Sequence, residues 1–312
     1  MAPLKLISGN SNPALAQKIA QALECPLTKI EIRRFQDGEI FAEIGESIRG
    51  CDVFVVQSTC PPVNDNLMEL LIMIDALKRA SARSITAVIP YYGYARQDRK
   101  VSPRSPITAK LVADILTASG ASRIVAMDLH AAQIQGFFDV PFDHLYAAPV
   151  LIQHLRHVKS DNWVMVSPDA GGVERARAFA KRLGGGIAII DKRRIAPNEA
   201  VAVNVIGEIK GKDVVILDDM IDTAGTLTQA SEVLLSQGAL SVIACGTHAV
   251  MSGTASERIS ASVLQKVIVT DTIPLRDHCL NNSKIVVLSV ANLLADAIRR
   301  VHQCESLSAL FV

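Results

Sequence analysis

The sequence lacks the segments that mark membrane and secreted proteins. No apolar run in its 312 residues is long enough to span a bilayer, and the opening stretch MAPLKLISGN has no apolar core of a signal peptide. The six cysteines are scattered without CxxC spacing, which suits reduced thiols better than a zinc site or a disulfide framework. We therefore expect a cytoplasmic protein that makes no membrane contact.

The sequence also lacks a strong excess of charge. Its 32 Lys and Arg residues nearly balance 31 Asp and Glu residues, for a formal net charge of +1. This balance argues against a protein that coats a polyanion, so we expect no nucleic-acid partner, and any phosphate must be bound by a local cluster. With 49% hydrophobic and 20% charged residues, the chain can bury the cores of two ordinary domains.

What is present is an alternation of short apolar runs with helical patterns. Seven runs read as strands, and two segments, 64–81 and 226–239, have helical periodicity. The expected strands are 52–58, 84–90, 123–130, 163–169, 187–192, 213–219 and 241–248. Near-continuous apolar strands linked by helices predict an α/β fold with parallel sheets covered by helices, which bind ligands at the carboxyl ends of the strands. The polar residues expected there are Asp128, His130, Asp169, Asp218 and Asp219.

A weak internal repeat suggests two related halves. Gly-x-Asp-Val begins a strand–helix–strand unit at Gly50 and again at Gly211. The pattern alone leaves duplication and coincidence about equally favoured. In the first unit Gln57-Ser58 stands where the second has Asp218-Asp219, so only the second half would keep an acidic pair. The boundary is expected near residue 145.

The most distinctive stretch is VVILDDMIDTAGT, residues 214–226. A short buried strand, Val214–Leu217, is followed by the adjacent carboxylates of Asp218 and Asp219 and then by Asp222. The Gly-containing turn after them starts a helix, and a helix N-terminus favours an anion through its free N–H groups and its dipole. The turn contains no cation and the chain has no Walker P-loop, so backbone N–H groups and threonine hydroxyls are expected to hold a phosphate monoester.

The acidic pair would serve another part of the same ligand. Carboxylates can accept hydrogen bonds from vicinal hydroxyls or hold Mg²⁺ through water. A ligand with a phosphate at one end and a diol at the other suits both halves of the stretch, which indicates ribose 5-phosphate. The alternative is a capped helix start with a solvated acidic turn, but adjacent carboxylates at the end of a buried strand are costly without partners.

This stretch resembles the phosphoribosyl diphosphate motif shared by type I phosphoribosyltransferases and ribose-phosphate diphosphokinases (PRPP synthetases). Five further segments resemble the class I diphosphokinases, and the similarity covers nearly the whole chain. They are RRFQDGE (33–39), YARQDRK (94–100), MDLHAAQIQGFFDVP (127–141), VSPDAGG (166–172) and DKRR (191–194). The resemblance implies two type I phosphoribosyltransferase-like domains. Residues 1–145 would contain the ATP motifs, and residues 146–312 the ribose 5-phosphate motif and a catalytic loop, with the last residues able to pack back on the first domain.

The implied activity is that of an ATP-dependent diphosphotransferase, a kinase of nucleotide biosynthesis. The anomeric hydroxyl of ribose 5-phosphate attacks the β-phosphorus of ATP, giving 5-phosphoribosyl 1-diphosphate and AMP. Positioning and charge neutralisation are expected to supply most of the rate, and no residue stands out as a general base. A phosphoribosyltransferase would lack the ATP motifs, and a non-catalytic regulatory homologue would have a long insertion and damaged motifs.

The ATP site is implied at two segments. Phe35 offers an aromatic face for adenine with acceptors nearby, although alone the segment reads as a turn between strands. Arginine forks match phosphate oxygens, so the loop around Arg96 suits a triphosphate, although alone it reads equally well as a solvated basic loop. By resemblance the ATP-binding residues are Phe35, Asp37, Gly38, Glu39, Arg96 and Gln97, and a neighbouring subunit can complete the site.

The resemblance also assigns metal-binding and catalytic residues. His130 and Asp169 are implied in Mg²⁺ binding, although a lone histidine is more often structural. The weaker candidates are Asp128, Asp139 and Asp143. Lys192 and Arg194 would lie on a flexible loop that brings positive charge to the transferring group, although alone they read as a solvated hairpin tip. The implied ribose 5-phosphate residues are Arg194, Asp218, Asp219, Asp222, Thr223, Ala224, Gly225 and Thr226.

Regulated members of the family are hexamers built from dimers, in which inorganic phosphate activates and ADP inhibits through a site shared between subunits. A homo-oligomer of this kind is therefore expected here, although a class without phosphate dependence exists. Hydroxyl and guanidinium groups can supply several hydrogen bonds to one phosphate. The matching residues are Ser47, Arg49, Ser81, Arg104, Ser306, Ser308 and Phe311, which otherwise read as ordinary surface and helix-end positions.

Overall fold

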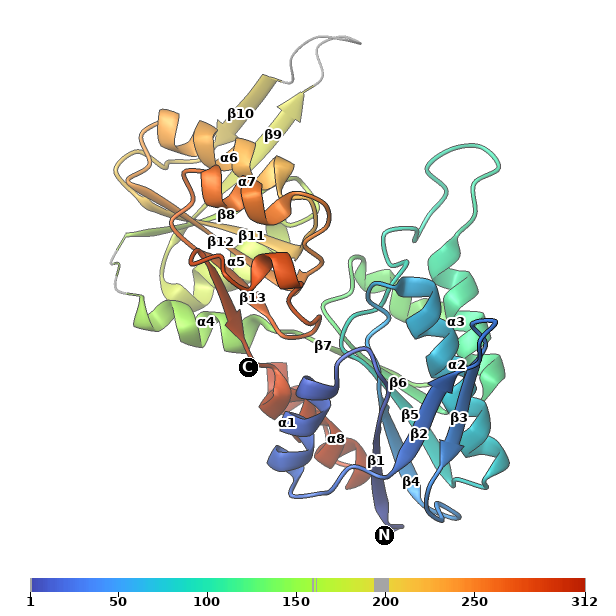
Figure 1. Cartoon of the computed structure of the whole chain (residues 1–312). Helices are drawn as coiled ribbons and strands as arrows, with labels where there is room; N and C mark the ends of the chain where they lie inside the picture. Colours follow the sequence, from blue (N-terminus) through green and yellow to red (C-terminus); the bar gives the residue numbers. More distant parts are fainter. Residues whose placement is uncertain (1, 159, 161, 194–201, 312) are drawn as a thin grey trace. The chain divides into compact units, whose positions relative to one another are not determined.

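The chain forms two units, shown in Figure 1 in colours that follow the sequence. The structure is a computed structural model and describes residues 2–158, 160, 162–193 and 202–311. The first unit groups the chain up to Tyr146 with Thr272–Pro274 and the segment from Ser289 onward, and the second holds Ala147–Asp271 and Leu275–Leu288. None of the described helices is long and apolar enough to cross a membrane.

The first unit is built on a five-stranded parallel sheet in the order β1-β4-β5-β6-β7. The strands are β1 (Leu4–Ser8), β4 (Asp52–Val56), β5 (Ser84–Ile89), β6 (Arg123–Met127) and β7 (Phe142–Leu145). An antiparallel hairpin, β2 (Ile30–Arg34) and β3 (Ile40–Ile44), lies outside this sheet. The central strands are almost wholly buried because helices cover both faces of the sheet.

Helices from both ends of the chain cover the first unit. They are α1 (Pro13–Leu23), α2 (Val63–Arg79), α3 (Thr108–Ser119) and α8 (Ala291–His302), with 3-10 turns η1 (Ala132–Phe137) and η3 (Ser308–Phe311). In Figure 1, α2 and α3 lie on one side of the sheet, and α1 and α8 lie together on the other. The C-terminal helix is fixed there partly by Arg299, whose Nη2 donates to the carbonyl of Ala22 at 2.9 Å. The C-terminal segment therefore completes one face of the first unit.

The second unit has a seven-stranded sheet in the order β10-β9-β8-β11-β12-β13-β14, parallel except for the pair β9–β10. The strands are β8 (Trp163–Ser167), β9 (Gly186–Arg193), β10 (Ala202–Ile206), β11 (Asp213–Ile221), β12 (Ser241–Ala249), β13 (Val267–Thr270) and β14 (Ile285–Leu288). The helices are α4 (Ala148–His157), α5 (Val173–Leu183), α6 (Gly225–Ser236) and α7 (Ala255–Ala261), with a 3-10 turn η2 (Asp277–Cys279).

The predicted α/β class with parallel, helix-covered sheets is confirmed. The seven predicted strands correspond to β4, β5, β6, β8, β9, β11 and β12, and the two predicted helices to α2 and α6. The end of one strand is wrong in detail, because β11 ends neither at Leu217 nor at Asp219 but continues to Ile221. The strand continues because β12 still pairs with it as far as Ile221 opposite Ala249. The acidic pair therefore lies within β11 and not after it.

Candidate active site

The acidic stretch of β11 lies beyond the point where this strand leaves β8. Pairing with β8 ends at Ile216, whereas pairing with β12 continues and places Asp218 opposite Gly246. The N–H of Asp219 donates to Oδ1 of Asp218 at 2.9 Å, and the side chain of Asp219 is buried. The structure therefore brings the two predicted carboxylates together at the edge of β11 that β8 no longer covers.

Asp218 titrates far above the usual range of a carboxyl group. Burial raises the pKa of Asp218, and the hydrogen bond and negative charge of Asp219 raise it further, to about 7. The backbone N–H of Asp219 and the charge of Arg175 on α5 act in the opposite direction but are outweighed. Asp218 can therefore release a proton near neutral pH when a ligand favours its ionised form.

We expect Asp218→Asn to raise the melting temperature of the ligand-free protein by several degrees at pH 8 and hardly at all at pH 4. An unfolded aspartate ionises near pH 4, whereas folded Asp218 keeps its proton up to about pH 7. The free energy of unfolding of the unmodified protein therefore falls as the pH rises between these values, and asparagine, which does not ionise, avoids this loss. Thermal melts at pH 4, 6 and 8 measure this. Glu232→Gln, at an exposed position of α6, is the control, and a gain from Asp218→Asn that is independent of pH would contradict the assignment.

The turn after β11 is the N-terminal end of α6. Within the described residues no side chain caps this helix, so its first N–H groups remain available to an anion. Ala224 has a φ of 58°, in the left-handed region where a β-carbon is strained. Such strain is often found where a loop is shaped to bind a ligand. These features support the predicted phosphate site at residues 222–226.

A cation lies beside this turn, which the sequence pattern did not reveal. Arg258 on α7 donates from Nη1 to the carbonyl of Thr223 at 3.0 Å. A β-carbon added at Gly225 would lie 3.2 Å from the same Nη1. Arg258 follows Thr223 by 35 residues, so no local motif could indicate this contact.

The predicted adenine residue lies at the tip of the β2–β3 hairpin. Phe35 closes the turn, since its N–H donates to the carbonyl of Glu39 at 2.9 Å and Gly38 has a φ of 96°. The ring of Phe35 is 45% exposed and stands edge-on to Phe41. The guanidinium of Arg33 lies 5.3 Å from the centroid of Phe35 and 4.6 Å from that of Phe41. The segment is thus a turn between strands that presents an exposed aromatic ring.

The other predicted ATP residues are also on exposed loops of the first unit. Oδ1 of Asp37 accepts from the N–H of Glu39 at 3.1 Å, inside the hairpin turn. Arg96 and Gln97 are exposed and follow β5. The carbonyl of Gln97 accepts from the N–H of Ala109 at 3.2 Å, which fixes this loop against the start of α3. The ATP assignments of these residues stay predictions.

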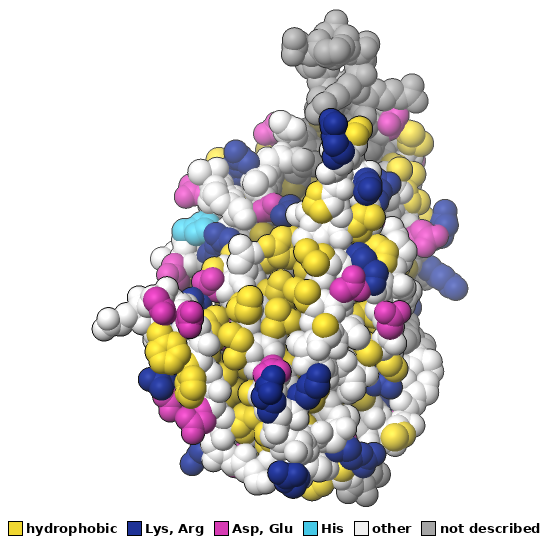
Figure 2. Space-filling view, turned by 90° about the vertical axis from the view of Figure 1, so that its right-hand side faces the viewer, with side chains coloured by type: hydrophobic (Ala, Val, Ile, Leu, Met, Phe, Trp, Pro, Cys, Tyr) yellow, Lys and Arg dark blue, Asp and Glu magenta, His cyan; other side chains and the backbone are white. Residues whose placement is uncertain are grey.

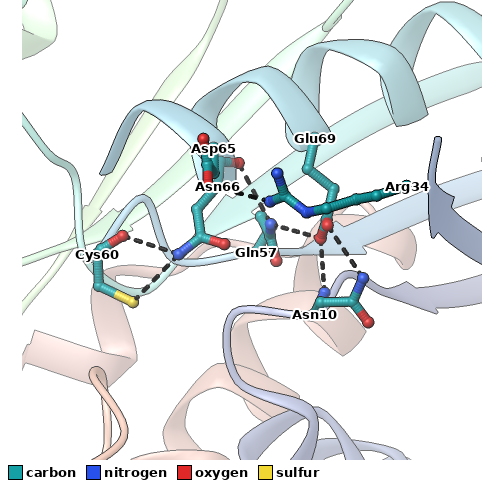
Figure 3. Close-up of polar contacts among 7 residues, drawn as sticks. All are labelled: Asn10, Arg34, Gln57, Cys60, Asp65, Asn66 and Glu69. Atoms are coloured by element: carbon teal, nitrogen blue, oxygen red, sulfur yellow. Dashed lines mark hydrogen bonds and ion pairs between the residues drawn. The ribbon is translucent and has the colours of Figure 1, made fainter. Parts of the chain in front are cut away.

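In the first unit, a buried hydrogen-bond network occupies the place of the acidic pair (Figure 3). Gln57 follows β4, and its Nε2 donates at 2.9 Å to Glu69 on α2, a residue that is only 3% exposed. The Glu69 carboxylate also accepts from the backbone N–H and from Nδ2 of Asn10, at 2.6 and 3.0 Å. In the first turn of α2, Asp65 accepts a hydrogen bond of 3.1 Å from Arg34 of the β2–β3 hairpin. The groups at this sheet edge thus bind one another, in contrast to the uncapped turn of the second unit.

The predicted metal residues lie in two loops, Asp128 and His130 after β6 and Asp169 after β8. Oδ1 of Asp169 accepts from the N–H groups of Gly171 and Gly172 at 2.8 and 3.0 Å. Asp128 is buried, and His130 is exposed two residues further on. In the described parts of the chain, no group of three or more His, Cys, Asp or Glu side chains could hold a metal ion. Because Mg²⁺ is usually bound by one or two carboxylates with substrate phosphates and water, single donors of this kind fit it, and the three assignments stay predictions.

One of the two predicted catalytic residues, Lys192, lies on the antiparallel ribbon of β9 and β10. Lys192 is on β9 opposite Val203 of β10. The side chain of Lys192 and the whole of Arg194 lie outside the described residues.

The weaker metal candidate Asp143 forms an ion pair with Arg123 on the neighbouring strand, at 2.6 Å.

The predicted effector residues come from several surface segments of the first unit. The N–H of Gly50 donates to the carbonyl of Ser81 at 2.9 Å, which places the loop of Arg49 beside Ser81. The hydroxyls of Ser306 and Ser308 share a hydrogen bond of 2.8 Å. The remaining members are Ser47 and Arg104, both exposed, and Phe311, whose side chain lies outside the described residues.

This chain is similar to known proteins both in sequence and in structure. Residues 4–120 match the N-terminal domain of ribose phosphate pyrophosphokinase, and residues 192–312 match the phosphoribosyl synthetase-associated domain. The chain is 57% identical to a ribose-phosphate pyrophosphokinase of Caldanaerobacter subterraneus subsp. tengcongensis, over 99% of this chain and 98% of that one. It is 54% identical to the Campylobacter jejuni protein of the same name, over 99% of both. The crystal structure of phosphoribosylpyrophosphate synthetase from Mycobacterium smegmatis matches with a TM-score of 0.92 at 45% identity, over 97% of this chain and 99% of that one.

Proposed function

Because this chain belongs to the ribose-phosphate pyrophosphokinase family and makes 5-phosphoribosyl 1-diphosphate, we propose which residues bind each substrate and which stabilise the transferring group. The enzyme transfers the diphosphoryl group of ATP to the C1 hydroxyl of ribose 5-phosphate and releases AMP, in nucleotide biosynthesis. Identity over the whole chain favours this activity over a phosphoribosyltransferase or a non-catalytic homologue.

We assign the phosphate and the hydroxyls of ribose 5-phosphate to different residues. This assignment depends on one observation, that α6 starts without a side-chain cap directly after the acidic end of β11. The free N–H groups and the threonine hydroxyls of the turn would hold the 5-phosphate. Asp218 and Asp219 would accept hydrogen bonds from the ribose hydroxyls, because ionised carboxylates are pure acceptors. Fixing the sugar at both ends would orient its C1 hydroxyl.

The contribution of the protein to the chemical step is positioning and charge. The C1 oxygen forms a bond to the β-phosphorus of ATP while the bond from that phosphorus to the oxygen of AMP breaks, with the two oxygens in line. Negative charge on the transferring group would be stabilised by Lys192, on the β9–β10 ribbon, and by Arg194. A substrate held in line removes most of the entropy cost of the encounter.

ATP would lie at the loops of the first unit. The exposed ring of Phe35 suits stacking on adenine, and the guanidinium of Arg96 suits the phosphate oxygens. In the first unit His130 and, more weakly, Asp128 would be ligands of Mg²⁺, and in the second unit Asp169 would be one. When bound, Mg²⁺ neutralises phosphate charge.

The assignment is tested by incubating the purified protein with ATP, ribose 5-phosphate and Mg²⁺ in the absence of any nucleobase. AMP and 5-phosphoribosyl 1-diphosphate should appear in equal amounts. A phosphoribosyltransferase would form neither product, and a non-catalytic homologue would leave ATP unchanged.

We infer that the enzyme is a homo-oligomer, a hexamer as in regulated relatives. Hydrophobic side chains gather on the face of the first unit that contains α2 and α3 (Figure 2). Met68 of α2 is 52% exposed and Leu111 of α3 is 57% exposed. Apolar patches on a protein surface commonly mark contacts with another chain. A second copy of this chain is the proposed occupant of this face.

We place the enzyme in the cytoplasm. All six cysteines are free thiols, and Cys51, Cys60, Cys245 and Cys279 are buried. Proteins in reducing compartments keep their cysteines in this form.

For regulation, we expect Arg49→Ala or Arg104→Ala to raise the phosphate concentration for half-maximal activation by about tenfold. ADP inhibition should weaken in the same variants, because each guanidinium would donate to a phosphate group that both effectors present to one pocket. Initial rates across a series of phosphate and ADP concentrations measure both effects. Full activity of the unmodified enzyme in phosphate-free buffer, unchanged by either substitution, would contradict the effector site.

A further inference from the structure

The guanidinium of Arg258 is held against the turn that starts α6. Its Nη1 donates to the carbonyl of Thr223 at 3.0 Å, and a β-carbon at Gly225 would come within 3.2 Å of the same atom. The helix that bears Arg258 is fixed in place, because Ala255 and Ile259 of α7 are fully buried in the core of the second unit. The fold therefore fixes the backbone of Arg258, whose exposed side chain is held against the turn by its hydrogen bond to Thr223.

The segment before α7 is tied to the same turn by backbone hydrogen bonds. The N–H of Met251 donates to the carbonyl of Ile221, and that of Ser252 to the carbonyl of Asp222, each at 3.0 Å. These bonds extend the pairing of β11 with β12 past the ends of both strands. The backbone leading into α7 is therefore bonded directly to the backbone leading into the turn.

A cation placed here is slightly unfavourable for the helix, and an anion bound beside it would offset this cost. The N-terminal end of a helix has a partial positive charge, and cations stabilise the opposite end. In the described part of the chain, the start of α6 has no side-chain cap and Arg258 forms no ion pair, since its hydrogen bond goes to a neutral carbonyl. A guanidinium beside a helix start without a side-chain cap suits a doubly charged group such as a phosphate monoester.

We propose that Arg258 is a substrate-binding residue for the 5-phosphate of ribose 5-phosphate, a role that rests on the proposed ribose 5-phosphate site. Its guanidinium supplies the positive charge that the turn lacks, and its hydrogen bond to Thr223 holds the turn in shape. A side chain at Gly225 would press on the guanidinium, which would have to shift by a few tenths of an ångström. A charged fork of donors is suited to phosphate oxygens, and it favours a phosphorylated sugar over the free pentose.

The test compares three substitutions in the full-length enzyme. Arg258→Ala should raise the KM for ribose 5-phosphate at least about tenfold, because a hydrogen bond to a charged group typically contributes about that much to affinity. The KM for ATP should change less than about twofold. Arg258→Lys keeps the charge and should lose only about threefold. Arg258→Gln keeps a donor for Thr223 without the charge and should resemble Arg258→Ala. Calorimetric binding of ribose 5-phosphate and the rise in melting temperature that it causes are the readouts besides activity.

The matched control is Lys210→Ala, which removes an exposed cation near the other end of α6. The Cγ of Lys210 would lie 3.1 Å from a β-carbon at Gly238, just beyond the last turn of this helix. This variant should bind ribose 5-phosphate as the unmodified enzyme does. Melting curves without ligand separate a loss of binding from a loss of folding.

Two results would overturn the proposal. If Arg258→Ala binds ribose 5-phosphate normally while Asp218→Ala does not, Arg258 has no part in the site but the site itself stands. If Arg258→Gln behaves as the unmodified enzyme, the residue holds the turn without contributing its charge. Normal binding in both Arg258→Ala and Asp218→Ala would instead reject the ribose 5-phosphate site.

Discussion

Lys192→Ala is expected to lower kcat by roughly 10²–10³-fold while the affinity for ATP changes less than about twofold. A positive charge that meets the transferring group only near the transition state contributes to the rate and not to ground-state binding. The fold agrees with such a role. Strand β9 pairs with β8 only as far as Ile189, so Lys192 lies beyond the parallel sheet on the ribbon with β10.

Steady-state kcat and a separate measurement of ATP binding are needed to distinguish these effects. Lys210→Ala, in the connection that follows β10, is a control for the loss of one lysine from the same unit and should leave kcat unchanged. A Lys192→Ala enzyme with the original kcat would remove this residue from the mechanism.

Asp218→Ala or Asp222→Ala should raise the KM for ribose 5-phosphate roughly 10- to 100-fold and the KM for ATP less than about twofold. Each substitution removes a carboxylate acceptor from the sugar side of the substrate, and hydrogen bonds to charged groups contribute about 1.5–3 kcal/mol. The effect of Asp218→Ala should be largest above pH 7, where Asp218 is ionised in the unmodified enzyme.

Initial rates with each substrate varied in turn, at pH 6 and pH 8, measure this prediction. Glu232→Gln on the exposed side of α6 is the control for loss of a carboxylate outside the site. Equal increases in the KM values for both substrates would mean that the acidic stretch does not belong to the sugar alone.

The parts of the fold that sequence patterns predicted are those with a strong local signal. The seven predicted strands and the long helix α2 are continuous apolar or periodic runs. Strand β13 was not predicted although it is fully buried, because it has only four residues. The hairpin β2–β3 was predicted only as a turn, because its exposed strand IEIRR is mostly polar. The end of β11 was misplaced because carboxylates are rare within strands, and only the pairing with β12 shows that the strand continues.

In the candidate site, too, features with a local sequence signal could be predicted and contacts between distant segments could not. The turn at residues 222–226 could be predicted because a buried strand, acidic residues and a glycine at a helix start follow one another in the sequence. Arg258 could not be predicted, because its contact with Thr223 depends on how α7 packs on the core. The buried network of Glu69, Gln57 and Asn10 was equally hidden, since its members come from three separate segments.

The return of α8 to the first unit affects the order in which the chain can fold during synthesis. Helix α1 emerges from the ribosome early, but α8, which packs on it, emerges only after the whole second unit. Domains usually fold in order from the N-terminus as they are made. Here the side of α1 that packs on α8 stays uncovered until the second unit has been translated. The first unit is therefore translated first but completes its packing last.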